Sequence, residues 1–141
     1  MPLRITHNAP LDALNTFGVR ARARRLVALD TLDDLPAALT TLAGERNRLV
    51  LGGGSNLLLA GDFDGTVLLI RTRGRQCRRT ATGAEVSLQA GESWDEAVRW
   101  TLDQGLAGLE NLAMIPGTCG AAAIQNIGAY GVELAERFAC L

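Results

Sequence analysis

The stretch LGGGSNLLLAGDFDG, residues 51–65, places three glycines and a small polar pair between two apolar runs. Glycine reaches positive φ and allows close backbone approach, at an ordering cost of about 0.5–1 kcal/mol each relative to alanine. Successive N–H groups in such a loop can converge on an anion such as a diphosphate, and Ser55 and Asn56 can add side-chain hydrogen bonds. An anion site is one interpretation of this stretch, and a tight strand-to-strand turn is the other.

Two common nucleotide-binding patterns do not fit this loop. A Walker-type phosphate loop requires a lysine, and all fourteen basic residues of the chain are arginine. The three glycines are also not spaced as the G-x-G-x-x-G that precedes a helix in dinucleotide-binding domains. Neither fingerprint therefore applies.

Apolar segments on both sides of the loop predict a mixed α/β fold. Residues 25–29, 48–53 and 66–70 are short apolar runs that predict strands. Between the first two, leucines at helical spacing over residues 32–42 predict a helix, and Pro36 predicts that it starts irregularly or late. The order strand, helix, strand, strand is typical of mixed α/β sheets.

The second half of the chain predicts a hairpin followed by an amphipathic helix. Two alternating segments meet around Thr82 and Gly83, as in a β-hairpin. Ser93, with Glu96 three residues later, predicts a capping box at the start of the helix. The buried face of this helix is expected to carry Trp94, Ala97, Val98, Thr101 and Leu102.

Periodicity is weak beyond this helix. Residues 105–131 are rich in glycine and alanine and predict a loop with one short helix near residues 121–125. The final RFACL, residues 137–141, predicts the beginning of a strand. An ending inside an apolar strand is unusual for a domain, so we expect the chain to be truncated.

The segment IPGTCGAAAIQNIGAYG, residues 115–131, is a second candidate binding element. Its glycines and alanines would let the backbone lie against a flat ligand, and Gln125 and Asn126 supply donors and acceptors for heterocycle edges. Small residues that pack a loop against a helix would give a similar composition. Both interpretations stay open for this segment.

Composition and charge are those of a folded soluble protein. The 141 residues are 48% hydrophobic and 21% charged, with a net charge of −1, which gives no general attraction to nucleic acid or anionic membrane. No apolar run approaches the ~20 residues that span a bilayer, so we expect a cytoplasmic protein. The three dispersed cysteines suit free thiols, and the lone His7, expected at the surface, leaves no convincing zinc site or nucleophile–histidine pair.

Arginines alternate with small apolar residues in VRARARR, residues 19–25. This alternation places Arg20, Arg22 and Arg24 on one side of an extended segment. A phosphate-binding stripe is one interpretation, but no aromatic residues interleave as they do in single-strand nucleic-acid grooves. We expect a solvated edge that blocks strand pairing instead.

Five blocks of the sequence are distinctive as a set. They are NTFG (15–18), LGGGSNLL (51–58), GTVLLI (65–70), AGESWDEAV (90–98) and GLENLAMIPGTCGAAAIQNIGAYGVEL (108–134). In order and spacing they resemble the UDP-N-acetylenolpyruvoylglucosamine reductase family, of which the chain would be the N-terminal FAD-binding portion only. The resemblance implies an α/β FAD-binding fold of the vanillyl-alcohol oxidase (PCMH) type. Residues 1–75 would form a first FAD-binding lobe and residues 76–141 the incomplete start of a second, with the substrate domain absent.

The resemblance also implies an activity. Members of the family are cytoplasmic flavoenzymes of peptidoglycan synthesis, and hence of cell wall biogenesis, cell shape and cell division. They take a hydride from NADPH onto FAD and pass it to the enolpyruvyl double bond of a UDP-sugar, which gives UDP-N-acetylmuramate. The expected partner is that small-molecule UDP-sugar, with no nucleic acid or membrane. An exposed apolar edge of a truncated fold could also drive self-association.

The site residues that the resemblance implies fall in the two glycine-rich segments. In the family, the glycine-serine-asparagine loop holds the FAD diphosphate, and the IPG and QNIGAYG blocks line the flavin. The matching positions are Gly52, Gly53, Gly54, Ser55, Asn56, Leu57, Ile115, Pro116, Gly117, Gly120, Gln125, Asn126, Gly128, Ala129 and Tyr130. No metal ligand is expected. No catalytic residue is expected either, because the family's arginine, glutamate and proton-donating serine lie downstream of the matched region.

Two other functions stay open. One is a different FAD-dependent oxidoreductase of the same fold, such as a sugar or lactone oxidase. The other is a non-catalytic nucleotide-binding module, which would agree with the missing acid and base groups.

Overall fold

The chain folds as two units. The computed structural model describes residues 3–140, and their contacts divide the chain into one unit up to Thr72 and another from Arg73 onward. Two hydrophobic clusters belong to unit 1 and one to unit 2.

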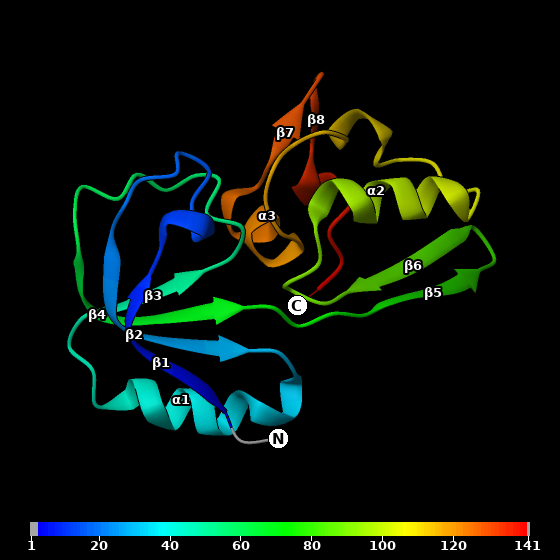
Figure 1. The fold of residues 1–141 in the computed structure, drawn as a ribbon. Coiled ribbons are helices and arrows are strands. Elements are labelled where there is room, and N and C mark those ends of the chain that lie inside the picture. The colour runs from blue at the N-terminus through cyan, green and yellow to red at the C-terminus, as the bar shows by residue number, and fades with distance from the viewer. Residues whose placement is uncertain (1–2, 141) are drawn as a thin grey trace. The chain divides into compact units, whose positions relative to one another are not determined.

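Unit 1 is built on a four-stranded sheet with the order β1-β2-β4-β3 (Figure 1). Its strands are β1 (Arg4–Pro10), β2 (Arg22–Leu29), β3 (Arg48–Leu51) and β4 (Phe63–Ile70). β1 is antiparallel to β2, whereas β2 and β3 both run parallel to β4. The mixed sheet and the three predicted strands are confirmed, with shifted ends. β1 lacks an apolar pattern from which it could be predicted, because its side chains are mostly exposed.

Strand β2 contributes to the cores on both faces of the sheet, and the change of face coincides with an irregularity in its pairing with β4. The register with β4 shifts between Ala23 and Arg25. Ala23 packs in one core, while Val27 and Leu29 pack in the other, although unbroken alternation would put all three on one face. Between these two pairs β2 advances by two residues and β4 by three, so the extra residue lies in β4, and the side chains of β2 change faces at the same irregularity.

Helix α1 (Leu35–Ala43) covers one face of this sheet (Figure 1). A 3-10 turn, Leu32–Asp34, precedes it, and Pro36 lies in its first turn, where a missing N–H costs nothing. The irregular start is thus confirmed. Leu42 is buried against the sheet, whereas Leu39 is 54% exposed, so the leucine pattern overstates the buried face of the helix.

Residues 52–62 cross the other face of the sheet. The neighbours β3 and β4 are parallel, so a tight turn cannot join them and the chain must return across the sheet. Leu57 and Leu59 pack into the core on this face, and Leu58 between them is 71% exposed. The interpretation of residues 51–65 as a tight turn is therefore wrong, since the segment ends one strand, crosses the sheet and begins the next.

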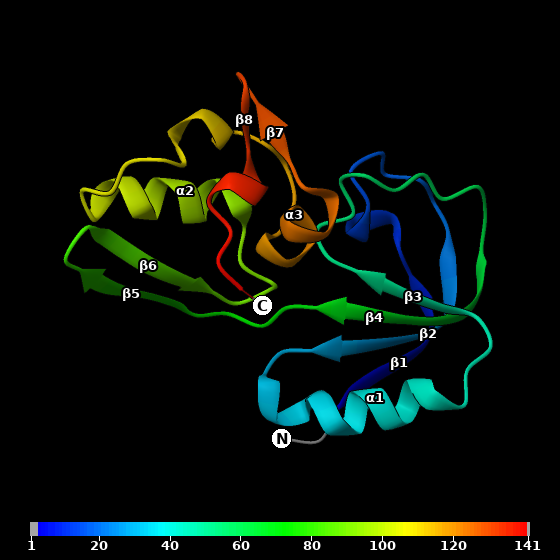
Figure 2. The ribbon, with the colours of Figure 1, turned by 180° about the vertical axis from the view of Figure 1, so that it is seen from behind.

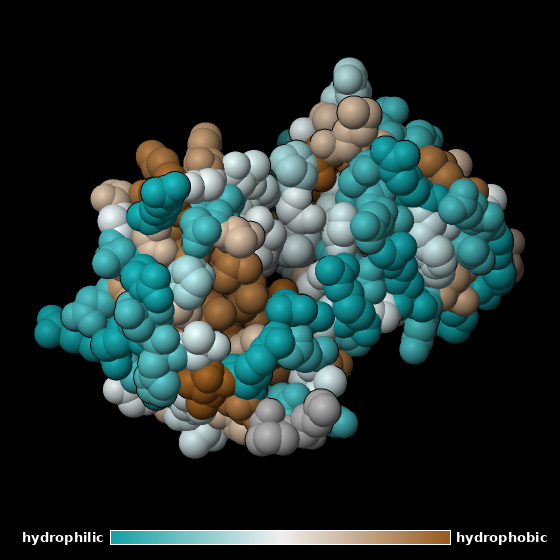
Figure 3. Space-filling view, in the orientation of Figure 1, coloured by the Kyte–Doolittle hydropathy of each residue, from teal (hydrophilic) through white to brown (hydrophobic). Residues whose placement is uncertain are grey.

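Unit 2 combines a hairpin with two helices (Figure 2). Strands β5 (Arg75–Thr80) and β6 (Gly83–Leu88) pair antiparallel below helix α2 (Trp94–Asp103), and α3 (Cys119–Gln125) follows later in the chain. The predicted hairpin and both helices are confirmed. Figure 3 shows a mainly hydrophilic visible face on this unit, whereas apolar side chains gather on the visible face of unit 1.

The start of α2 differs from the prediction. Ser93 is the N-cap residue, but its side chain makes no capping hydrogen bond. Glu96 accepts a hydrogen bond from the Arg75 guanidinium at 3.0 Å instead of turning back to the N-cap. The predicted capping box is therefore wrong, because a long-range ion pair takes the glutamate. Leu102, placed by periodicity on the buried face, is exposed.

A second, short hairpin begins near the end of the segment predicted as loop and extends two residues beyond it. It consists of β7 (Gly128–Ala129) and β8 (Val132–Glu133). The two residues between them, Tyr130 and Gly131, both have positive φ, at 52° and 77°. Two-residue hairpin turns require this backbone geometry, so the AYG motif has a structural role of its own.

The end of the described chain is irregular. A 3-10 turn, Leu134–Glu136, follows β8, and residues 137–140 form no strand. The predicted terminal strand is wrong over these residues, and position 141 lies outside the described part. Among residues 3–140, no helix is long and apolar enough to cross a membrane.

Two leucines of α1 test the packing of unit 1. Leu42→Ala should lower the free energy of unfolding by about 2–5 kcal/mol, because it removes buried side-chain volume. Leu39→Ala is the matched control on the same helix and should change stability by less than about 0.5 kcal/mol. Urea unfolding followed by circular dichroism measures both. Equal losses would contradict the orientation of α1.

Candidate functional site

The glycine loop of unit 1, residues 52–57, begins directly after β3. Gly54 is buried with a φ of +64°, and a Cβ there would lie 2.0 Å from the carbonyl oxygen of Leu14. Both the left-handed backbone and this contact require glycine. The close approach at Gly54 is therefore made to the protein's own backbone.

The NTFG turn, residues 15–18, is hydrogen-bonded to the glycine loop. The buried Asn15 side chain donates to the Leu11 carbonyl at 2.8 Å and accepts from the Val19 N–H at 2.9 Å. Thr16 donates to the Gly54 carbonyl through its N–H at 3.1 Å and through Oγ1 at 3.3 Å. The residue-by-residue analysis of the sequence missed this contact, although NTFG is one of the distinctive blocks.

The remaining loop residues differ in burial. Gly52 and Ser55 are half-buried, and Gly53 and Asn56 are exposed. Leu57 packs against the core and so has a structural role, whereas Ser55 has no hydrogen-bond partner among residues 3–140. Backbone N–H groups and the Ser55 hydroxyl are thus the groups at this loop that a ligand could engage.

The other predicted residues lie in unit 2, where segment 90–94 supports them. The backbones of Ser93 and Thr118 form an antiparallel bridge, and Trp94 N–H donates to the Gly117 carbonyl at 3.1 Å. Gly120 N–H donates to the Ala90 carbonyl at 3.0 Å. A Cβ at Gly120 would lie 2.8 Å from the Ala90 Cβ, so the start of α3 requires glycine for packing.

Glu92 is a buried carboxylate that fixes this supporting segment. It accepts hydrogen bonds from Gly74 N–H and from Arg75 Nε, both at 2.7 Å, and Arg73 lies 3.6 Å away. Burial alone would raise the pKa of Glu92, but the Gly74 hydrogen bond and the Arg75 and Arg73 charges outweigh it and hold the pKa below its usual value. Its backbone carbonyl accepts from Cys119 N–H at 2.9 Å.

Asn126 organises the turn after α3. It has left-handed backbone at φ 43° and caps the helix. Its Nδ2 donates to Glu133 and its Oδ1 accepts from Ala135 N–H, both at 2.9 Å. A structural role therefore accounts for the geometry of this predicted flavin contact.

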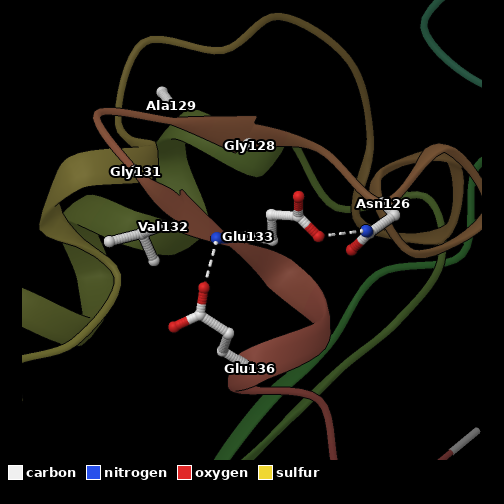
Figure 4. A pocket seen from close by; sticks show the side chains of 7 residues that line it. All are labelled: Asn126, Gly128, Ala129, Gly131, Val132, Glu133 and Glu136. Carbon is white, nitrogen blue, oxygen red and sulfur yellow. Dashed lines mark hydrogen bonds between the residues drawn. The ribbon is translucent and has the colours of Figure 1, made fainter.

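Figure 4 shows a depression of about 470 Å³ beside these groups. Three predicted residues, Asn126, Gly128 and Ala129, line it together with Glu133 and Glu136. Glu136 accepts a hydrogen bond from Glu133 N–H at 3.1 Å. No lining residue carries a positive charge, so the depression suits an uncharged group better than a phosphate.

Large apolar side chains are exposed near the predicted flavin segment. Tyr130 is 89% exposed, and Met114 and Ile124 are exposed as well. Met114 has a φ of 63°, and its N–H donates to Asp95 Oδ1 at 2.7 Å. This hydrogen bond is the main cause that lowers the pKa of Asp95, and the Arg99 guanidinium is the second. Asp95 thus holds the backbone immediately before Ile115, Pro116 and Gly117.

The buried Cys119 is not an activated nucleophile. Burial is the main cause that raises the pKa of the Cys119 thiol to about 11, and the nearby Glu92 carboxylate is the second. This cysteine is therefore neutral at pH 7. All three cysteines are free, as predicted. Over residues 3–140, no group of three or more histidine, cysteine, aspartate and glutamate side chains is placed to hold a metal ion.

The arginine stripe of β2 is not the predicted solvated edge. Arg20, Arg22 and Arg24 are exposed as expected, but Arg22 and Arg24 belong to β2, which pairs with β1 on one side and β4 on the other, and Arg20 precedes the strand. The Arg22 guanidinium binds Asn8, and Arg24 forms ion pairs with Glu45 and Asp64. The side chains of this interior strand therefore stabilise the surface of the sheet rather than block its pairing.

The glycine requirement can be tested by a pair of substitutions in one loop. Gly54→Ala should destabilise unit 1 by more than about 2 kcal/mol, because it adds left-handed strain and a clash with Leu14. Gly61→Ala is the control, since nothing lies within 4 Å of a Cβ there. Thermal unfolding measures both. A fully stable Gly54→Ala variant would show that the loop geometry is wrong.

The buried Glu92 predicts a pH-dependent stability of unit 2. A carboxyl whose folded pKa lies below its usual 4.5 stabilises the fold above that pH, and this stabilisation is lost as pH falls through the folded pKa. Glu92→Gln should lower stability by about 3 kcal/mol at neutral pH and should flatten the loss on acidification. Urea unfolding at several pH values measures this.

Glu85→Gln is the control for that experiment, because the Glu85–Arg78 pair is exposed. It should change stability by less than about 1 kcal/mol. An acid slope in Glu92→Gln as steep as in the unchanged chain would contradict the assignment to Glu92.

Known proteins resemble this chain along nearly its whole length. The model of a family described as "FAD binding domain" matches residues 23–139. The UDP-N-acetylenolpyruvoylglucosamine reductase of Azoarcus sp. (strain BH72) is 57% identical over 147 residues, which cover 99% of this chain and 42% of the relative. That of Pseudomonas aeruginosa is 49% identical over 141 residues, which cover 98% of this chain and 41% of the relative.

A solved structure agrees with these relatives. The crystal structure of UDP-N-acetylenolpyruvylglucosamine reductase from Thermus caldophilus matches with a TM-score of 0.68 at 26% sequence identity. The match covers 96% of this chain and 46% of that one. The chain thus spans about two fifths of the curated relatives it matches. Because the family model covers most of its residues, the chain belongs to the FAD-binding domain family.

Proposed function

We propose that this chain is the FAD-binding part of an enzyme that reduces the enolpyruvyl ether of UDP-N-acetylglucosamine to UDP-N-acetylmuramate. The observation that carries the proposal is the 57% identity to a UDP-N-acetylenolpyruvoylglucosamine reductase across 99% of the chain. Membership of the FAD-binding domain family supports FAD as the cofactor. The product would serve peptidoglycan synthesis and therefore the cell wall.

The proposed reaction is a two-electron reduction of a carbon–carbon double bond. NADPH is oxidised to NADP⁺ and gives up a hydride, and the enolpyruvyl double bond gains that hydride together with one proton. When bound, FAD supplies the carrier for these two electrons. The residues of this chain would bind and orient the cofactor, and no proton transfer is assigned to them.

The glycine loop has the chemistry that a diphosphate requires. Gly54 gives the loop a fixed left-handed bend, and Ser55 is free of protein partners within residues 3–140. A phosphate oxygen accepts hydrogen bonds from backbone N–H and hydroxyl groups, and such bonds are strong because the acceptor is charged. We therefore assign Gly52, Gly53, Gly54, Ser55 and Asn56 to the FAD diphosphate.

The predicted residues of unit 2 have the chemistry that a flavin ring requires. The depression beside Asn126 has no cationic lining residue, and the side chain of Tyr130 is free to stack on a flat ring. The backbone on both sides of Pro116 is held by Asp95 and by segment 90–94, which would present it in one conformation. We therefore assign Ile115, Pro116, Gly117, Gly120, Gln125, Asn126, Gly128, Ala129 and Tyr130 to the flavin side of the cofactor.

The two units correspond to two roles in this proposal. Unit 1 would be the first FAD-binding lobe and unit 2 the start of the second. The acid and base groups of the reaction would come from elsewhere in the enzyme, so the 141-residue chain by itself would bind FAD without turnover. The three free thiols favour a reducing compartment, and we place the protein in the cytoplasm. Self-association through an exposed apolar surface stays a prediction, which sedimentation would test.

A flavin titration tests the cofactor assignment. The 141-residue chain should quench the fluorescence of FAD on binding. The double variant Ser55→Ala, Asn56→Ala should raise the Kd about tenfold or more, because it removes hydrogen bonds to a charged group. Ser87→Ala with Asn111→Ala is a matched control at exposed positions of unit 2 and should leave the Kd unchanged.

An activity assay of the longer enzyme tests the reaction. NADPH oxidation should require both FAD and the enolpyruvyl substrate, and should weaken in the Ser55, Asn56 double variant at limiting FAD. Flavin binding without activity on the enolpyruvyl substrate would indicate a different oxidoreductase. If the chain does not bind FAD, a non-catalytic nucleotide-binding module is the only one of the three functions that still agrees with the result.

A further inference from the structure

The contact between the NTFG turn and the glycine loop fixes the direction of one peptide group. Thr16 places two donors on the Gly54 carbonyl, its N–H at 3.1 Å and its Oγ1 at 3.3 Å. A trans peptide is planar, so its C=O and the N–H of the next residue point in opposite directions. With the Gly54 carbonyl directed at Thr16, the N–H of Ser55 is directed away from the turn.

The NTFG turn is itself held firmly, so it can act as a fixed support. The Asn15 amide donates to the Leu11 and Val19 carbonyls at 2.8 and 3.1 Å and accepts from Val19 N–H at 2.9 Å. Asn15 is 5% exposed, and Leu11 is fully buried in the core of unit 1. The turn therefore cannot follow a movement of the loop without disrupting buried hydrogen bonds.

A peptide beside glycine needs such a support. Gly54 lacks a side chain that would restrict its backbone, so the peptide that follows it can rotate more freely than others. Rotation would turn the Gly54 carbonyl toward the ligand, and a carbonyl oxygen repels a phosphate oxygen. Two hydrogen bonds from Thr16 oppose that rotation.

We propose that Thr16 is a positioning residue for the diphosphate-binding loop, which acts through the Gly54 carbonyl and keeps the Ser55 N–H available to an anionic oxygen. The inference rests on the proposed function, because the FAD diphosphate is the anion that this loop would take. Ser55 has no hydrogen-bond partner among residues 3–140, as a donor kept for a ligand requires. Thr16 itself makes no contact with the cofactor in this proposal.

Three variants of the 141-residue chain test the role of Thr16. Thr16→Val keeps the side-chain shape and removes the hydroxyl, and Thr16→Ser restores the hydroxyl. Thr31→Val is the matched control, because it removes an exposed hydroxyl that donates to Asp34 at 2.8 Å elsewhere in unit 1. Thr16→Val should raise the Kd for FAD about three- to tenfold. Thr16→Ser and Thr31→Val should stay within about twofold of the unchanged chain.

A second ligand separates positioning from a general loss of stability. ADP carries a diphosphate but no flavin, so Thr16→Val should raise the Kd for ADP by about the same factor as the Kd for FAD. Thermal midpoints without ligand should be the same for Thr16→Val and Thr31→Val. The positioning role is wrong if Thr16→Val binds FAD as tightly as the unchanged chain, or if affinity falls only in proportion to the thermal midpoint.

Hydrogen exchange without cofactor distinguishes this inference from the proposed function. The amide of residue 16 donates to the Gly54 carbonyl and should exchange faster in Thr16→Val, but not in Thr16→Ser. If the unchanged chain does not bind FAD, the proposed function fails, while this exchange pattern would still support the hold on Gly54. Unchanged exchange in Thr16→Val would overturn the inference whatever the chain binds.

Discussion

The parallel pairing of β3 with β4 is the constraint on which unit 1 depends. Parallel neighbours cannot be joined by a tight turn, so residues 52–62 must travel across the sheet before β4 begins. This crossing places the glycines at the end of β3 and Leu57 and Leu59 over the second face of the sheet. The contrast of flexible and buried residues in one stretch follows from a single connection.

Unit 2 depends in a similar way on a buried ion pair. The Glu92 carboxylate accepts hydrogen bonds from the Gly74 N–H and the Arg75 guanidinium. Its backbone carbonyl accepts a hydrogen bond from the Cys119 N–H at the start of α3. A buried carboxylate of this kind is costly unless it is fully paired, and removal of one partner is more costly still. Segments 73–75, 90–94 and 117–120 are therefore fixed by one another, and the predicted flavin residues lie on that framework.

Glycines in the candidate site can serve both internal packing and ligand binding. Gly54 and Gly120 are required by contacts with Leu14 and Ala90, so packing alone explains them. These same contacts fix the backbone that a ligand would meet. The packing and binding interpretations of the two segments are therefore compatible. Asn126 gives the same result, because its side chain is used by the turn after α3.

Local sequence patterns were enough to predict the apolar strands of the sheet, the hairpin near Gly83, and helices α1, α2 and α3. The sequence also determined the family, because five blocks kept their order and spacing. Three features follow only from the folded chain: the irregular register between β2 and β4, the pairing of the polar strand β1, and the ion pair of Glu96 with Arg75 in place of a capping box. The difference lies in the separation of the interacting residues along the chain. Propensity and periodicity reflect a few neighbouring residues, whereas strand register, ion pairs and the hydrogen bonds from Thr16 to Gly54 join segments that are distant in sequence.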